Sequence, residues 1–176
     1  MERYHEVKSI LKDLETEYGR ISKARERAFG QGQLKLYDQE ISKLDEIIAA
    51  DERYLAEARG WLELDMEKAN EAARAMGFDE FNDQTNWTEI QYKLNDYYNE
   101  NILNSNDEKL EKQWEQWKSW IDKAIDSHET VLEREDAWID HMNERQDKLY
   151  DKWNKEIELK VDLDERSRKL IDLKLK

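Results

Sequence analysis

The sequence predicts an all-α protein: an elongated antiparallel helical hairpin or three-helix coiled-coil rod, with a small helical tip and a short extended C-terminal segment. Three observations lead to this prediction. No proline, the residue that breaks helix interiors, occurs in 176 residues. Charged residues make up 41% and hydrophobic residues 38%, which leaves either disorder or a narrow apolar stripe between helices. Seven Trp and eight Tyr argue against disorder, because disordered chains are poor in aromatic residues.

The first two predicted helices cover about residues 2–28 and 34–76. Apolar residues recur along both in alternating steps of three and four, which is the repeat of a coiled coil. Residues 30–33 contain two glycines and separate the helices, and so short a link predicts an antiparallel hairpin. Asp51 and Asp65 interrupt the apolar seam of the second helix. A lone polar residue in a seam sets the register at some cost in stability.

A small tip is predicted for residues 77–105. Gly77 ends the second helix, because glycine is the usual residue just past a helix C-terminus. A stretch rich in turn-forming residues follows it. Thr85 or Asn86 then caps a short helix, about 87–103, since both side chains accept hydrogen bonds from free backbone N–H groups.

The last long helix is predicted for about residues 106–155, with Ser105 and Glu108 as its capping box. Its seam carries extra apolar flanks, which suit contact with two other helices. We expect this helix to return along the second one, with the first helix against both, so that residues 1–156 form one rod. The flanking apolar side chains are Trp120, Ile125, Leu132, Ile139 and Trp153.

The pattern changes after this helix. Ile157, Leu159, Val161 and Leu163 alternate with charged residues, and a period of two is typical of a strand. No other segment offers a clear strand, and a single strand is unstable in water. Either the helix continues, or the segment pairs with something outside this chain. We predict an extended segment and a short terminal helix for 157–176, in a piece of a longer polypeptide or a subunit that docks on a partner.

Composition excludes several classes of function. The net charge of −14 repels nucleic-acid phosphates and anionic lipid, so we expect no direct nucleic-acid binding. No stretch approaches the roughly 20 apolar residues of a membrane span. The N-terminus is polar and does not resemble a signal peptide.

Nothing in the sequence predicts an enzyme. The only histidines are His5, His128 and His141. Glu135 and Asp136 lie two turns from His128, and the residues four before and four after His141 are Ala137 and Arg145, so neither histidine completes a helical metal site and we expect no metal. Paired carboxylates need a cleft to act as acid and base, and a narrow rod has none. The only closely spaced glycines, Gly30 and Gly32, lack the Lys-Ser/Thr of a phosphate-binding loop. We therefore expect no catalytic residue and no cofactor.

Four stretches of the chain resemble segments that recur in large bacteriophage tail proteins, the tape-measure and related virion structural proteins. The first three are residues 2–6, 21–30 (which ends in Ala-Phe-Gly) and 34–41, and the fourth is residues 150–163. The resemblance implies a structural role, with helices that assemble inside a tail tube and set its length. It implies no cofactor and no chemistry.

The first functional hypothesis is therefore a structural phage protein that acts through coiled-coil assembly with itself or with other virion or tail proteins, in the virion or in the host cytoplasm. The alternatives are a cellular helical adaptor or binding module, and an acidic inhibitor or DNA mimic that only the charge supports. Trp114, Trp117 and Trp120 form the densest aromatic patch, and the first two share the seam of the core. The candidate partner-binding residues are Trp120, Ile157, Leu159, Val161 and Leu163.

Overall fold

The computed structural model describes residues 3–175, and the predicted all-α class is confirmed. Residues 1 and 2 of the predicted rod (1–156) and residue 176 of the predicted terminal segment (157–176) lie outside the described residues. The chain divides into two units. Unit 1 contains the residues up to Tyr54 and those from Asp136 onward, and unit 2 is Leu55–Glu135. The helices are α1 (His5–Arg27), α2 (Gly30–Met76), α3 (Trp87–Asn101) and α4 (Glu108–Leu175).

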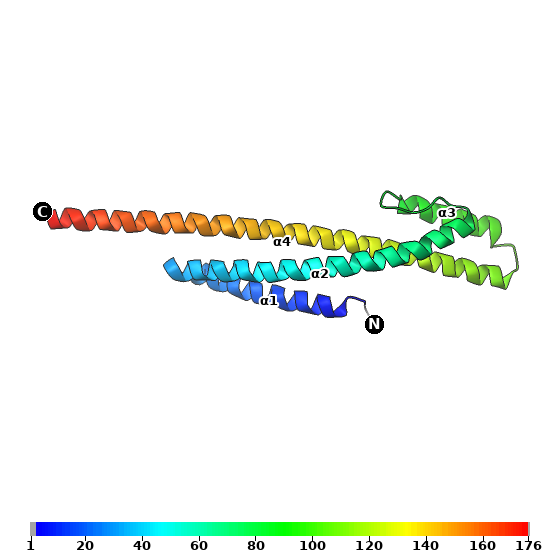
Figure 1. Cartoon of the computed structure of the whole chain (residues 1–176), viewed down its shortest axis with the longest axis horizontal. Helices are drawn as coiled ribbons and strands as arrows, with labels where there is room; N and C mark the ends of the chain where they lie inside the picture. Colours follow the sequence, from blue (N-terminus) through cyan, green and yellow to red (C-terminus); the bar gives the residue numbers. More distant parts are fainter. Residues whose placement is uncertain (1–2, 176) are drawn as a thin grey trace. The chain divides into compact units, whose positions relative to one another are not determined.

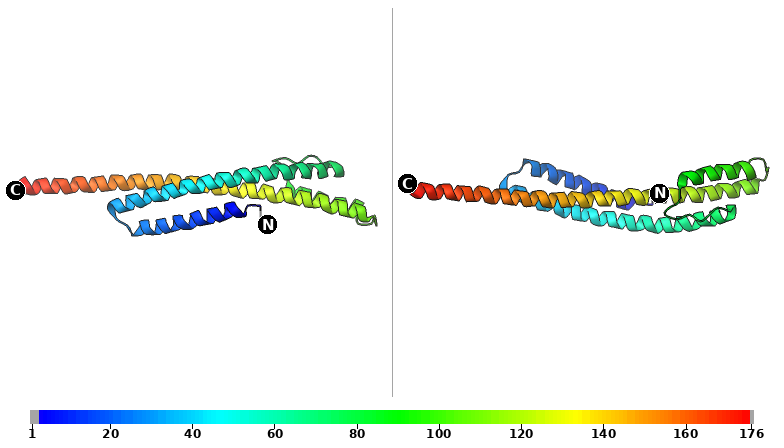
Figure 2. Two further views of the ribbon diagram at one scale, coloured as in Figure 1. Left: turned by 60° about the horizontal axis from the view of Figure 1, so that its bottom comes forward. Right: turned by 90° about the horizontal axis from the view of Figure 1, so that it is seen from above.

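In unit 1, α1 lies beside the first part of α2 as an antiparallel hairpin (Figures 1 and 2). Leu44 and Ile47 of α2 are almost fully buried there, as are Val7 and Leu11 of α1. Burying one such aliphatic side chain contributes about 1.5–3 kcal/mol to folding. At the open end of the hairpin the ring of Tyr4 stacks on that of Tyr54, with centroids 4.9 Å apart.

The link between α1 and α2 is shorter than predicted. Only Ala28 and Phe29 separate the helices, and Gly30 already begins α2, so the predicted break at 30–33 is wrong. Gly30 has φ = 58°, a conformation that costs a side-chain-bearing residue energy, so this one glycine makes the turn. At the end of α1 the carbonyl of Arg25 accepts a 3.1 Å hydrogen bond from the N–H of Ala28 and one of 3.4 Å from the side-chain amide of Gln33.

Unit 2 packs the end of α2, α3 and the start of α4 around one apolar cluster. Ala69, Ala72 and Ala73 are fully buried on α2, and such small side chains let neighbouring helices approach closely. Larger side chains from the other elements fill the remaining space. The cluster is Ala69, Ala72, Ala73, Met76, Phe81, Ile90, Leu94, Trp117, Ile121 and Ala124.

Gly77 ends α2 as predicted, with φ = 79°. Its N–H and that of Phe78 donate to Arg74 and Ala73 at 3.2 and 2.8 Å, which satisfies carbonyls at the helix end. The loop that follows is held by one side chain of α2. Asn70 accepts a 2.6 Å hydrogen bond from the N–H of Phe81 and donates one of 3.3 Å to its carbonyl.

The helix caps agree with the sequence prediction in one case and differ in the other. Asn86 caps α3, because its side chain accepts a hydrogen bond of 3.2 Å from the N–H of Glu89. The predicted capping box of Ser105 and Glu108 is wrong. Asp107 caps α4 instead, accepting from the N–H groups of Lys109 and Leu110 at 3.0 and 3.3 Å. A carboxylate there also interacts favourably with the helix dipole.

The extended segment predicted after residue 156 is wrong as well, since α4 continues without interruption to Leu175. The reason is that an apolar pattern with a period of two fits a helix as well as a strand. Residues two apart in a helix lie about 200° apart around its axis, so a period-two pattern also places apolar side chains on two opposite helix faces. A helix also satisfies its own backbone hydrogen bonds, whereas the described chain contains no strand to pair with an extended segment.

Candidate protein-docking surface on α4

Within unit 1, α4 contacts α1 and α2 through polar side chains. From Asp136 to Leu175, no described side chain of α4 is buried. Four basic residues of α4, spaced four, three and four apart, pair with acidic residues of α2. The pairs are His141–Asp51, Arg145–Asp45, Lys148–Glu40 (3.4 Å) and Lys152–Asp38 (2.5 Å). We call this set the ion-pair seam.

Asp51 and His141 form one centre of the seam. Asp51 is fully buried, and its Oδ2 is in hydrogen-bond contact with His141 Nδ1. His141 Nε2 lies 3.8 Å from Glu15 of α1, so this imidazole faces carboxylates from two helices. The hydrogen bond to Asp51 raises the pKa of His141, and the charges of Asp51, Glu15 and Glu144 act in the same direction. The side chain at the predicted interruption of the seam therefore joins α2 to α4.

Glu40 forms the second centre. Its carboxylate is also fully buried, and it accepts hydrogen bonds from Ser22 Oγ at 3.0 Å and from the guanidinium of Arg25. Lys148 of α4 completes the group. Arg25 also lies 4.9 Å above the ring centre of Tyr37, a favourable cation–π contact. One buried carboxylate thus links all three helices of unit 1.

Beyond the seam, α4 extends past the start of α2 (Figure 1). Asp38 of α2 pairs with Lys152 of α4. Because the two helices are antiparallel, Gly30, where α2 begins eight residues before Asp38, lies level with a position near Lys160 of α4. Every described residue from 160 to 175 is exposed, a helical segment of about 24 Å at 1.5 Å per residue.

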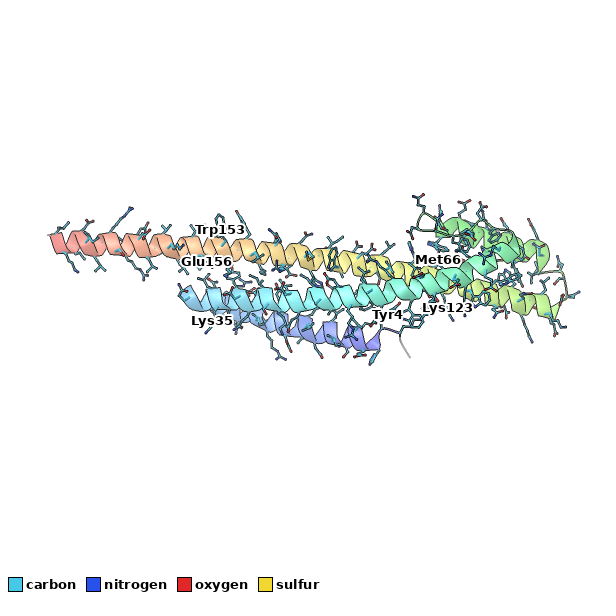
Figure 3. The ribbon with its side chains drawn as sticks, viewed as in Figure 1. Tyr4, Lys35, Met66, Lys123, Trp153 and Glu156 are labelled. Carbon is cyan, nitrogen blue, oxygen red and sulfur yellow. The ribbon has the colours of Figure 1, made fainter. Side chains whose placement is uncertain are left out.

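Two apolar stripes run along this half of α4. The inner stripe continues the face that carries the ion-pair seam, and it consists of Leu159, Leu163, Leu170 and Leu173. The outer stripe lies on the opposite face, within an arc of about 100°. Its members are 42–61% exposed, and they are Ile139, Met142, Tyr150, Trp153, Ile157 and Val161. Trp153 points away from α2 in Figure 3. Exposed apolar patches of this kind mark interaction surfaces.

The four apolar residues of the predicted extended segment divide between these stripes. Ile157 and Val161 belong to the outer stripe, and Leu159 and Leu163 belong to the inner one. Leu159 is half-buried, whereas the other three are exposed. The structure therefore places them as two pairs on opposite faces of one helix.

Sequence reasoning missed the outer stripe. Ile139 and Trp153 are exposed, although the sequence predicted that they widen a contact between helices. A signal for the stripe was present. Ile139, Tyr150 and Val161 are eleven residues apart, as are Met142 and Trp153, and an eleven-residue repeat keeps side chains on one face of a straight helix.

The tryptophan patch lies in unit 2. Trp117 is buried in the apolar cluster, and Trp114 and Trp120 pack against its edge. The ammonium group of Lys68 lies 5.7 Å from the ring centre of Trp120, which covers part of this candidate partner-binding side chain. Trp120 is half-buried and belongs to unit 2, whereas all residues of both stripes belong to unit 1.

Unit 2 also has an open hollow of about 280 Å³ beside the loop after α2. Arg59, Met66, Asn70, Phe81 and His128 are among the residues that line it. The ring of His128 lies 6.2 Å from that of Trp87. Among residues 3–175, no group of three His, Cys, Asp or Glu side chains is placed to hold a metal ion. The hollow therefore offers mixed polar and apolar walls without a convergent set of catalytic groups.

None of the helices in the described chain has the length and apolarity that crossing a membrane requires. Comparisons of this chain with protein-family models, with curated proteins and with solved structures found no match. The functional argument therefore rests on the residues and on their arrangement.

Proposed function

We propose that this chain is a non-enzymatic structural protein that works by lateral helix–helix assembly, as a component of a phage tail or virion of the tape-measure kind. The observation that carries the proposal is the second half of α4. It presents apolar stripes on two opposite faces, and its last 16 described residues are all exposed. A helix with apolar faces on two sides is suited to lie between partners.

Two further features support an assembly role. In a coiled-coil arrangement of the helices, the ion-pair seam fixes the register of α4 within unit 1 without using the outer stripe. The stretches that resemble phage tail proteins include residues 150–163, which contain members of both stripes. Other virion proteins and further copies of this chain are the proposed partners, and the virion or the host cytoplasm during assembly is the proposed location.

Multi-angle light scattering after size exclusion, over a range of protein concentrations, tests the proposal. We expect the mass of the wild-type chain to rise with concentration. A variant with Tyr150→Ser, Trp153→Ser, Leu163→Ser and Leu170→Ser is expected to stay a monomer, because it loses apolar surface that only association buries. Circular dichroism checks that its helix content is kept.

A matched control carries four substitutions of exposed polar residues on α4 outside both stripes, namely Asn143→Ser, Asp147→Ser, Asn154→Ser and Asp172→Ser. It is expected to associate as the wild type does. A wild-type chain that remains monomeric at every concentration overturns the proposal of self-assembly and favours an adaptor that binds a different protein. Electron microscopy of concentrated samples then distinguishes ordered fibres or tubes from small oligomers.

A further inference from the structure

The C-terminal end of α4 differs in charge from the rest of the chain. The whole sequence carries a net charge of −14, so two copies repel each other over most of their surface. Residues 157–175 contain five basic and five acidic side chains and are neutral. Four of the five acidic ones lie in the first half of this segment, at 158–165, and four of the five basic ones lie in the second half, at 166–174. Two antiparallel copies of such a segment bring opposite charges together.

The inner stripe has the spacing of a two-stranded coiled coil. Leu159, Leu163, Leu170 and Leu173, together with Arg166, follow one another in steps of four, three, four and three. In heptad notation Leu163 and Leu170 occupy a positions, and the other three occupy d positions. The flanking g positions are then Asp162 and Lys169, and the e positions are Lys160, Ser167 and Lys174.

These flanking residues discriminate between the two orientations of a pair. In a parallel pair, g positions face the e positions five residues later in the partner. Lys155, the g position seven residues before Asp162, then faces Lys160 of the other copy, and Lys169 faces its Lys174, so like charges meet four times in the dimer. An antiparallel pair brings g positions against g positions and e positions against e positions.

The antiparallel register that layers Leu159 on Leu170 of the other copy removes these repulsions. It also layers Leu163 on Arg166, whose long aliphatic stem packs while its guanidinium reaches out to acidic neighbours. Asp162 then faces Lys169 of the other copy, twice by symmetry, and Lys160 faces Ser167. Two attractive pairs thus replace four repulsive ones.

We propose that the partner which covers the inner stripe is a second copy of this chain, paired antiparallel over residues 159–170. This inference rests on the proposed function and names the partner of one of its surfaces. The paired segment is about 18 Å long, and short helical pairs are marginal in water. We therefore expect a weak, concentration-dependent dimer, in which the outer stripe stays available for other contacts.

Cross-linking tests orientation and register, and the absence of cysteine in the chain makes single thiols unambiguous. The variants are Asp162→Cys and Lys169→Cys, one of them enlarged by a fusion so that mixed dimers differ in mass. A short bis-maleimide reagent is expected to join the two variants when they are mixed, several-fold more than it joins either variant to itself. In the proposed register, two copies of residue 162 are offset by seven residues, about 10 Å along the axis.

Charge exchange tests the same pairs without a reagent. Asp162→Lys places Lys against Lys169 twice, and we expect dimerisation to weaken about tenfold, as measured by sedimentation velocity. The double variant Asp162→Lys with Lys169→Asp restores the attraction and is expected to dimerise like the wild type. Asp164→Lys makes the same change of charge away from the inner stripe and serves as the control.

The outcomes separate this inference from the proposed function. A chain that associates through α4, but whose thiols cross-link equally well within one variant, is paired in parallel and overturns the inference alone. Association without any cross-linking, or without rescue in the double variant, overturns it too and points to contacts through the outer stripe. A chain that stays monomeric at all concentrations overturns both.

Discussion

The imidazole of His141 on α4 contacts the fully buried carboxylate of Asp51 on α2 through its Nδ1 atom. Two residues 90 positions apart in the chain thus form an interhelical pair inside unit 1. The second oxygen of the carboxylate, Asp51 Oδ1, is buried without a hydrogen-bond partner among the described side chains. A buried carboxylate with one unsatisfied oxygen depends strongly on the partner it does have.

Stability is expected to fall as the pH rises above neutrality. The pKa of His141 is raised by its hydrogen bond to Asp51, so the fold favours the protonated imidazole. This contribution is fully present below the unfolded pKa of about 6.5 and is lost as the pH rises through the folded value. Urea unfolding at a series of pH values measures it.

His141→Gln is expected to remove the part of the pH-dependent loss of stability that comes from His141, because glutamine does not titrate. The exposed residue His5 provides the control, and His5→Gln is expected to leave the slope unchanged. Parallel pH profiles for wild type and His141→Gln contradict the assignment of the pH dependence to this pair.

Two acidic residues within one turn of α2 are expected to differ in their importance. Glu40→Ala removes a fully buried carboxylate and leaves Arg25 and Lys148 without it, which costs about 3 kcal/mol. Asp38→Ala breaks only an exposed pair with Lys152 and costs less than about 1 kcal/mol. Chemical denaturation monitored by circular dichroism gives both values, and equal losses contradict the central role of Glu40.

The loop after α2 is expected to depend on Asn70. Its side chain both accepts from and donates to the backbone of the buried Phe81, so Asn70→Ala leaves two polar groups unpaired. We expect a loss of about 1–3 kcal/mol and faster hydrogen exchange at the Phe81 amide. Asn82→Ala, which removes an exposed hydrogen bond to Gln84, serves as the control. Unchanged exchange at Phe81 in Asn70→Ala contradicts this role.

Gly60 inside α2 and Gly77 just after its end are expected to respond in opposite directions to alanine. Gly77 has φ = 79°, so Gly77→Ala strains the backbone and destabilises the fold by about 1 kcal/mol. Gly60 lies inside the helix, and a Cβ there meets no atom within 4 Å. Gly60→Ala is expected to stabilise the chain by about 0.5–1 kcal/mol. Thermal unfolding shows the two opposite shifts, and a shift of the same sign contradicts the account.

Local signals were sufficient where structure depends on nearest neighbours. Gly77 as the end of α2, and a cap for α3 at Thr85 or Asn86, followed from glycine conformation and from side-chain capping, and the structure has Asn86 as the cap. The prediction of a capping box at Ser105 was wrong because Asp107, two residues later, caps the helix with a charged acceptor for the N–H groups of Lys109 and Leu110. Such alternatives a few residues apart are too close in energy for a sequence pattern to separate.

The sequence by itself determined that the chain is helical, because it has no proline and its apolar residues recur every three or four positions. Only the tertiary structure decided what each face of a helix contacts. It showed that Asp51, which the sequence presented as an interruption of the seam, is buried against α4, that Glu40 is a second buried joint between helices, and that Ile139 and Trp153 are exposed. The physical reason is that periodicity specifies which side chains share a face, whereas burial depends on which other helix, if any, lies opposite that face.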